Sequence, residues 1–222
     1  MFLRVLGSSS AGNQYVLENN NGNQLLIECG LKYDKVAKYI NFNKVQGLII
    51  SHAHNDHCLE KQKFGLAGID IYDHTNLVAG KKQTIGDFEI LPIPVNHGNE
   101  PTFSFIIKDK PSNKKILFCT DLEQIPNIAD THYKIMLLET NFSQEIVNNK
   151  IVNGGQFNRG CFTHNSLENL IEWLKVRKNK PENLVLIHLS NSGLINCDIA
   201  LEKVKEYAQN VFVAKPQLKI LF

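Results

Sequence analysis

The chain has 222 residues, 43% of them hydrophobic and 21% charged, which is ordinary for a globular protein and long enough for one sizeable core. Its formal net charge of +2 is too small to indicate a nucleic-acid or membrane partner by charge alone. The five cysteines form no C-x-x-C pair, and the N-terminus lacks the basic start and long apolar run of a signal peptide. We therefore expect a cytoplasmic protein with a single domain over residues 1–222 and no membrane span.

Short β-rich segments separated by Gly, Asn and Ser turns fill the first half of the chain, and helical patterns become more frequent in the second half. Asn165 and Glu168 have the spacing of a capping box before an amphipathic helix. Two sheets packed together with helices outside would suit this order. Strands are predicted at 2–6, 15–18, 24–29, 45–51, 69–72, 88–95, 103–108, 116–120, 135–139, 184–188, 211–214 and 218–221. Helices are predicted at 34–40, 58 to about 66, from 165 onward, and 200–207.

Four metal-ligand side chains occur within six residues, in the string His52-Ala53-His54-Asn55-Asp56-His57, directly after a predicted buried strand. Imidazole and carboxylate groups are good ligands for Zn²⁺ and similar ions. Alternate residues of an extended loop point the same way, so His52 and His54 are expected to converge on one ion, and Asp56 and His57 on a second. Two ions about 3.5–4 Å apart can hold both the attacking and the leaving oxygen. The alternative is a chance cluster in a solvated loop.

Three further ligand-type residues, His97, Asp121 and His188, each follow an apolar predicted strand at its C-terminal end. Such positions lie on a rigid scaffold and face a shared edge. A single His or Asp there is more often a cap or turn residue. Together with the histidine string, the three residues indicate one metal site built from distant parts of the chain.

The H-x-H-x-D-H string, followed in order by these three residues, resembles the metallo-β-lactamase superfamily, and the resemblance covers nearly the whole chain. It includes the early turn 7–13 and the strand 25–30. The resemblance implies an α/β fold, a four-layer αβ/βα sandwich with the metals at one edge. It also implies the metal ligands: His52, His54 and His97 for the first ion, Asp56, His57 and His188 for the second, and Asp121 as the bridge.

The segments around Glu139, His164 and His188 resemble the tRNase Z-like and phosphodiesterase branch, and within it small single-domain bacterial and phage members related to a DNA exonuclease. This implies that Glu139 and His164 assist the departing oxygen. The plainer interpretations are a helix-terminal role for His164 and a salt bridge for Glu139. Position 28 is Glu where many relatives carry Asp. A long tRNA-gripping insertion and an added nuclease-type domain are both missing, which counts against tRNA 3′ processing.

The leading hypothesis is a dinuclear metal-dependent hydrolase of phosphodiester bonds, a nuclease or a cyclic-nucleotide phosphodiesterase. Asp56 would orient the attacking hydroxide, and His164 and the metals would stabilise charge on the leaving oxygen. The ligands suit zinc, although Mn²⁺ or Fe²⁺ would also be held. The expected partners are nucleic acid or a small cyclic nucleotide, and a homodimer is one expected assembly. The alternatives are a thioester or lactone hydrolase of the same fold and a non-enzymatic metal-binding module.

The early turn that carries Ser8, Ser9 and Asn13 allows two interpretations. Its hydroxyls and backbone amides could touch phosphate beside the metals. Alternatively, these residues only form the turn, as Ser and Asn often do.

Overall fold

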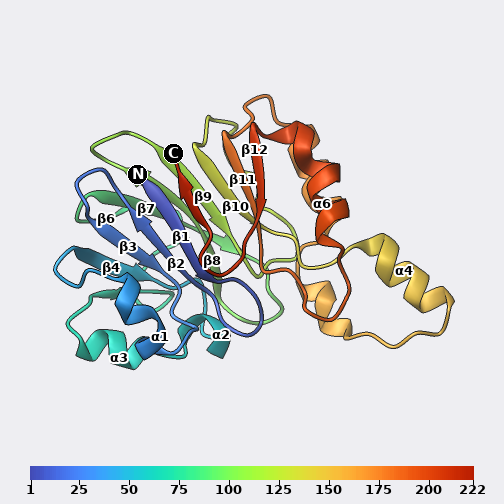
Figure 1. Ribbon diagram of the computed structural model, residues 1–222, viewed down its shortest axis with the longest axis horizontal. Coiled ribbons are helices and arrows are strands. Elements are labelled where there is room, and N and C mark those ends of the chain that lie inside the picture. The colour runs from blue at the N-terminus through green and yellow to red at the C-terminus, as the bar shows by residue number, and fades with distance from the viewer.

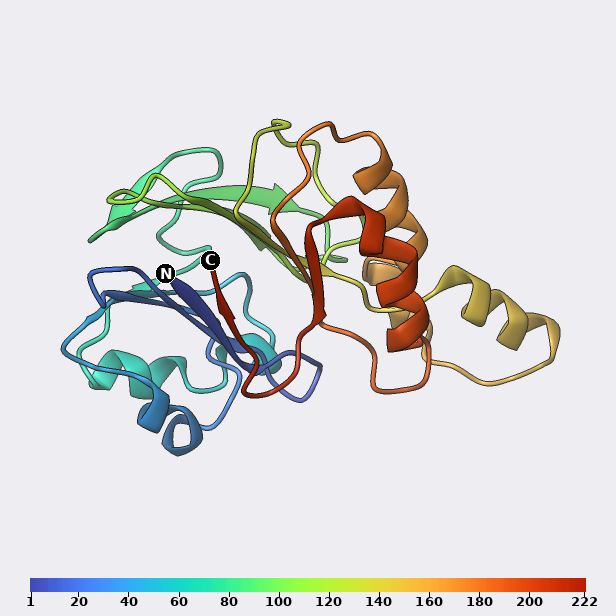
Figure 2. The ribbon, with the colours of Figure 1, turned by 45° about the horizontal axis from the view of Figure 1, so that its top comes forward.

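The computed structural model describes residues 1–222, apart from the side chain of Arg159. Thirteen strands form two mixed sheets that pack face to face, and helices lie outside both sheets (Figures 1 and 2). This arrangement confirms the predicted α/β sandwich. Among the described residues, no helix is both long and apolar enough to cross a bilayer.

The first sheet has six strands in the order β13-β1-β2-β3-β4-β5. Its strands β1, β2, β3 and β13 pair antiparallel, whereas β3, β4 and β5 pair parallel. The Asn-rich turn at 19–23 joins β2 to β3, as its sequence predicts, and Gly22 has a φ of 77° there. The strand bounds are β1 Phe2–Gly7, β2 Gln14–Glu18, β3 Gln24–Ile27, β4 Val45–Ile49, β5 Ile71–Tyr72 and β13 Lys219–Leu221.

The second sheet has seven strands in the order β12-β11-β10-β9-β8-β7-β6. Strands β9 to β12 run parallel, so the C-terminal ends of β9, β10 and β11 reach the same edge of the sheet. Strands β6 to β9 pair antiparallel. The strand bounds are β6 Gln83–Ile85, β7 Phe88–Val95, β8 Thr102–Asp109, β9 Lys115–Cys119, β10 Ile135–Glu139, β11 Asn183–Ile187 and β12 Asn210–Val213.

Three apolar layers hold the sheets and helices together. The layer between the sheets includes Tyr15 and Phe118, whose rings meet edge to face at 5.3 Å. Strands β3, β9, β10 and β11 are buried on both faces, which explains why they read as continuous hydrophobic runs rather than as alternating patterns. The second layer joins the first sheet to α1 and α3, and the third joins the second sheet to α5 and α6.

Helix α4 projects away from the sandwich, whereas α5 and α6 lie against the second sheet (Figure 2). The projecting segment lies between β10 and α5, so it leaves and re-enters the fold beside Glu139 and His164. The helices are α1 Tyr33–Val36, α2 Asn55–Cys58, α3 Lys61–Leu66, α4 Gln144–Val152, α5 Leu167–Lys175 and α6 Cys197–Val204. Short 3₁₀ helices cover Ala37–Tyr39, Arg159–Thr163 and Lys205–Tyr207.

Several predicted boundaries and one cap were wrong. Ser166, not Asn165, caps α5 by accepting a hydrogen bond from the Asn169 N–H at 3.1 Å. Asn165 is fully buried and donates instead to the backbone oxygen of Glu139 at 2.9 Å, so a tertiary contact overrides the local capping pattern. Helix α4 and strand β6 were not predicted, because an Asn-rich helix and a short exposed edge strand carry weak periodicity.

Candidate metal centre

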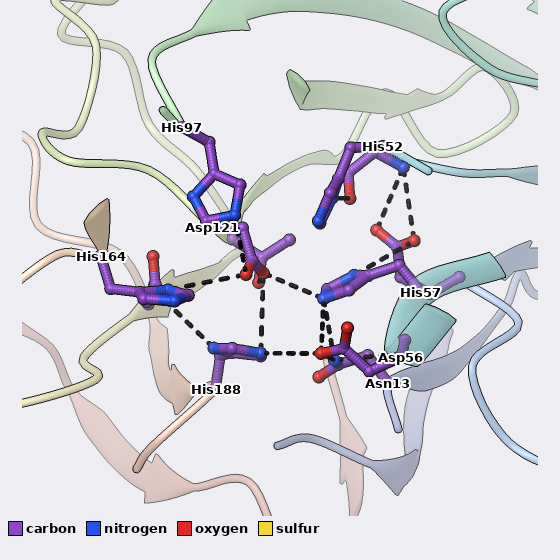
Figure 3. A network of polar contacts seen from close by, with 12 residues as sticks. Asn13, His52, Asp56, His57, His97, Asp121, His164 and His188 are labelled. Carbon is purple, nitrogen blue, oxygen red and sulfur yellow. Dashed lines mark hydrogen bonds and ion pairs between the residues drawn. The ribbon is translucent and has the colours of Figure 1, made fainter. Parts of the chain in front are cut away.

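The loops that follow four strands converge at one edge of the sandwich (Figure 3). His52 and His54 follow β4, His97 follows β7, Asp121 follows β9 and His188 follows β11. The carboxyl ends of strands from both sheets thereby bring together side chains that lie far apart in the sequence.

All seven residues predicted as metal ligands lie in this cluster. Their potential ligand atoms form overlapping groups in which the atoms lie within 4.8 Å of one another. Two of these groups match the two metal positions that the family resemblance implies, and Asp121 belongs to the groups that connect them. The groups are His52/His54/His97, Asp56/His57/His188, His52/His57/Asp121 and Asp121/Glu139/His164/His188.

Helix α2 carries part of the histidine string, so a helix begins at Asn55 and not at Cys58 as predicted. The backbone of His54 is still extended, but Asn55 begins the helix that carries Asp56 and His57. This turn of helix packs closely on Gly30, where an added Cβ would lie 1.7 Å from the Asp56 backbone oxygen. The close approach requires glycine and fixes the helix against the end of β3.

Backbone and hydroxyl oxygens orient the histidines of the first group. The Nδ1 of His97 donates to the backbone oxygen of Thr163 at 3.0 Å, which leaves Nε2 directed toward Asp121. The Nδ1 of His52 lies 2.9 Å from the Ser51 hydroxyl. Its Nε2 is buried and has no hydrogen-bond partner among the described protein atoms. An outer hydrogen bond at Nδ1 with Nε2 left for an ion is the usual arrangement of a metal-binding histidine.

Carboxylates orient the histidines of the second group. His57 directs Nδ1 toward Glu28 at 3.4 Å and Nε2 toward Asp121 at 3.0 Å. His188 directs Nδ1 toward Glu139 at 3.2 Å and Nε2 toward Asp56 at 3.3 Å. Both rings therefore have a carboxylate on their outer side and present Nε2 to the centre.

The buried carboxylates strongly bias the protonation of these rings. Burial lowers the pKa of His188, but the carboxylates of Asp121, Asp56 and Glu139 outweigh it and raise the pKa to about 10. Burial opposes charge on His57 as well, but Asp121 and Glu28 raise its pKa well above the ordinary value. Buried carboxylates need compensating positive charge, and the raised pKa values of His57 and His188 favour imidazolium in that role. A divalent ion could replace those protons, since metal binding releases protons from its ligands.

His52 has the opposite bias. Burial and the neighbouring ring of His57 lower the pKa of His52 to about 2, although Asp121 opposes the shift. The ring is therefore neutral and offers a free lone pair, the form in which histidine binds metals.

Glu139 and His164 form a buried pair beside the two groups. The Nδ1 of His164 lies 2.6 Å from Glu139 Oε1, and the Leu122 N–H donates to Glu139 Oε2 at 3.0 Å. Burial raises the pKa of Glu139, but the charge of His164 outweighs it and the pKa is lowered. Burial lowers the pKa of His164, and Glu139 reverses this and raises it. The contact places the His164 side chain beside the ligand groups, while its backbone N–H ends the 3₁₀ helix 159–163 by donating to the Cys161 oxygen at 3.0 Å.

Three side chains that support the ligand histidines were not identified as functional from the sequence. Glu28 is fully buried and accepts hydrogen bonds from the Ser51 N–H at 3.2 and 3.3 Å, in addition to facing His57. Asn141 donates to the backbone oxygen of His188 at 2.9 Å. Ser51 supports His52. Two signals were available for Glu28, a charge within the apolar run 25–29 and a position where many members of the resembled family carry Asp.

Three of the residues around the centre have left-handed backbone conformations. Glu28, Asp121 and His188 have φ values of 64°, 51° and 52°. The conformation is strained for side chains other than glycine and persists only where surrounding contacts require it. It also explains why β3 and β11 end earlier than predicted, at Ile27 and Ile187.

A pocket of about 570 Å³ opens over the cluster. His54, Asp56, His97, Asp121 and His188 line its floor, and the re-entering segment that precedes α5 and the loop after His188 line its walls. Among the described side chains, which exclude that of Arg159, the lining includes no lysine or arginine. The wall residues are Ser10, Asn141, Asn158, Gly160, Cys161, Thr163, His164, Ser190, Asn191, Ser192 and Leu194.

Solved structures share this fold at low sequence identity. The chain is similar to the metallo-β-lactamase fold protein YhfI from Bacillus subtilis, with 17% identity, a TM-score of 0.78 and 99% of each chain covered. A diphosphatase from the PhnP family shares 14% identity with a TM-score of 0.67, over 100% of this chain and 97% of the other. The short form of human tRNase Z shares 14% identity with a TM-score of 0.64, over 100% and 99%. No family model and no curated protein sequence matches the chain.

Proposed function

We propose that this chain, which has the metallo-β-lactamase fold, is a single-domain hydrolase that cleaves phosphodiester bonds with two divalent metal ions, zinc by the nature of its ligands. The observation that carries the proposal is the convergence of seven ligand side chains, all but the exposed His54 buried or half-buried, and the Glu139–His164 pair on one pocket. A metal-binding module without activity would need only the ligands, whereas the added carboxylate–imidazole pair suits proton transfer.

The residues present fit two ions. His52, His54 and His97 would hold one, Asp56, His57 and His188 would hold the other, and Asp121 would contact both. The unpartnered Nε2 of His52 and the buried carboxylates are the features that an ion would satisfy. When bound, such ions supply Lewis-acid activation of a water nucleophile and neutralise negative charge that develops on phosphoryl oxygens.

The protein side chains contribute orientation and proton transfer. The neighbours His188 and His57 lower the pKa of Asp56 although burial opposes the shift, so its carboxylate stays ionised and can orient a water molecule by accepting its hydrogen bond. His164 lines the pocket, and its Nδ1 contact with Glu139 leaves Nε2 to donate a proton to the departing oxygen. Glu139 thus favours the protonated form of His164.

The pocket favours a small phosphodiester, of the size of a cyclic nucleotide, over a long nucleic acid. A polymer is usually held along a positively charged groove by Lys and Arg side chains. The described lining instead offers neutral Asn, Ser and Thr groups, which suit a sugar or a base edge. The structurally similar diphosphatase and tRNase Z also support phosphoester chemistry for this chain, without distinguishing between substrate sizes.

A substrate panel tests the proposal. Metal-loaded protein should hydrolyse cyclic mono- or dinucleotides faster than single-stranded DNA, double-stranded DNA or RNA, as followed by chromatography of the products. Preferred cleavage of a polymer would make the protein a nuclease of the same chemistry. Turnover of a glutathione thioester or a lactone without any phosphodiester would contradict the proposal. A metal-loaded protein that is inert on the whole panel would indicate a binding module.

A further inference from the structure

We infer that the turn at residues 7–13, between β1 and β2, is a positioning element for one metal position alone, the one formed by Asp56, His57 and His188. The inference rests on the metal centre of the proposed function and states which contacts support only one of its two metal positions. The turn carries two side chains that reach this group, Ser8 and Asn13. The sequence alone did not show whether these residues only form the turn or contact phosphate.

Ser8 holds the backbone of His188. Its Oγ accepts the His188 N–H at 2.9 Å and the Tyr15 hydroxyl at 2.7 Å. Tyr15 is fully buried, so its hydroxyl cannot turn to water instead. His188 has a left-handed backbone with a φ of 52°, a conformation that needs outside support. The Tyr15–Ser8–His188 chain supplies that support, although the three residues lie on different strands and loops.

Asn13 holds the helical turn that carries Asp56 and His57. Its backbone N–H donates to the Asp56 backbone oxygen at 2.7 Å, and its backbone oxygen accepts the Gly30 N–H at 3.0 Å. The fully buried side-chain Nδ2 donates to Asp56 Oδ2 at 3.2 Å and lies 2.9 Å from His57 Nε2 (Figure 3). The amide thereby fixes the Asp56 carboxylate beside the ring nitrogen of His57 that faces the centre.

The other metal position is supported from elsewhere. The Ser51 hydroxyl contacts His52, and the Thr163 backbone oxygen accepts from His97. Among the hydrogen bonds of the described residues, none joins the turn at 7–13 to His52, His54 or His97. The two metal positions therefore depend on different supporting hydrogen bonds. Substitutions in the turn should weaken metal binding at one position and leave the other unchanged.

Metal binding by the purified protein tests this division. We expect Ser8→Ala and Asn13→Ala each to weaken the affinity of one of two Zn²⁺ ions by roughly 10- to 100-fold, the usual effect of losing an outer-layer partner, and to leave the other affinity unchanged. Isothermal titration of chelator-treated protein measures both affinities, and elemental analysis gives the stoichiometry. Ser8→Thr keeps the hydroxyl and should restore binding. Ser9→Ala is the matched control, since Ser9 Oγ accepts the Ala11 N–H within the same turn.

Double variants identify which position is affected. The Ser8→Ala effect should disappear in a His188→Ala background, where that position is already lost, and should persist in a His54→Ala background. Circular dichroism of each variant checks the fold, and Asn13→Ala carries the test if Ser8→Ala does not fold. Equal weakening of both ions, or no weakening of either, would overturn the inference. A wild-type chain that binds fewer than two ions would instead overturn the proposed function, and this inference with it.

Discussion

Asp121→Asn is expected to remove metal from the centre and to slow phosphodiester hydrolysis by roughly 10³-fold or more, because a metal ion supplies several kcal/mol of transition-state stabilisation. Asp121 Oδ2 lies 3.0 Å from His57 Nε2, and Oδ1 lies 3.8 Å from His97 Nε2, so this carboxylate faces both metal positions. Its pKa is held well below the ordinary value, because His188 and His57 outweigh the effect of burial. Elemental analysis and steady-state kinetics measure the two losses.

Asparagine is the informative replacement because the backbone of Asp121 has a φ of 51°, which Asn tolerates. The variant therefore changes the charge and leaves the loop conformation available. Asp109→Asn is the matched control, since Asp109 is also a buried carboxylate but ends β8, beside the opposite end of β9. It should keep its metal and its kcat. Retention of both ions in the Asp121 variant would contradict the bridging role proposed for Asp121.

His164→Gln is expected to lower kcat by roughly 10²- to 10⁴-fold, the usual range for a lost general acid, while metal content stays at the wild-type level. Burial lowers the pKa of His164, but the charge of Glu139 outweighs it and raises the pKa, so the protonated ring persists to a higher pH than in an ordinary histidine and is lost as the pH rises through the raised value. Glutamine can keep a hydrogen bond to Glu139 but cannot transfer a proton.

The leaving group separates proton donation from simple positioning. A nitrophenolate leaves without a proton, so the variant should hydrolyse nitrophenyl phosphodiesters at close to the wild-type rate and be slow only on alkyl or ribose esters. His132→Gln is the matched control, because the His132 side chain is 55% exposed and pairs with Glu182. An equal rate loss on both kinds of substrate would contradict proton donation by His164 and leave it a positioning role.

Much of the fold could be predicted because its strands carry strong local signals. The predicted strands 88–95 and 135–139 match β7 and β10 to the residue. The apolar runs also end where ligand-type side chains begin, which placed the site at one edge of the sandwich. What failed was local detail decided by tertiary contacts. Asn165 does not cap α5 as predicted, because its side chain donates to the buried Glu139 backbone oxygen, and Ser166 caps the helix instead.

The residues of the candidate site could be predicted from the sequence, but the contacts that position them could not. His52, His54, Asp56 and His57 are concentrated in the sequence, and their residue types alone indicate metal chemistry. The contacts of Ser8 and Asn13 with the ligand residues Asp56, His57 and His188 cross more than forty residues of sequence, up to 180 for Ser8 and His188. No local pattern encodes such a contact. The left-handed backbone at Glu28 was equally hidden, since nothing in an apolar strand pattern signals where it must end.

Metal content measured together with activity tests the central claim most directly. The account predicts that chelator-treated protein loses hydrolysis of a small phosphodiester and that added Zn²⁺ restores it, with the rate reaching its plateau at two ions bound per chain. Full activity in metal-free protein would contradict the account, and so would a chain that takes up no ion.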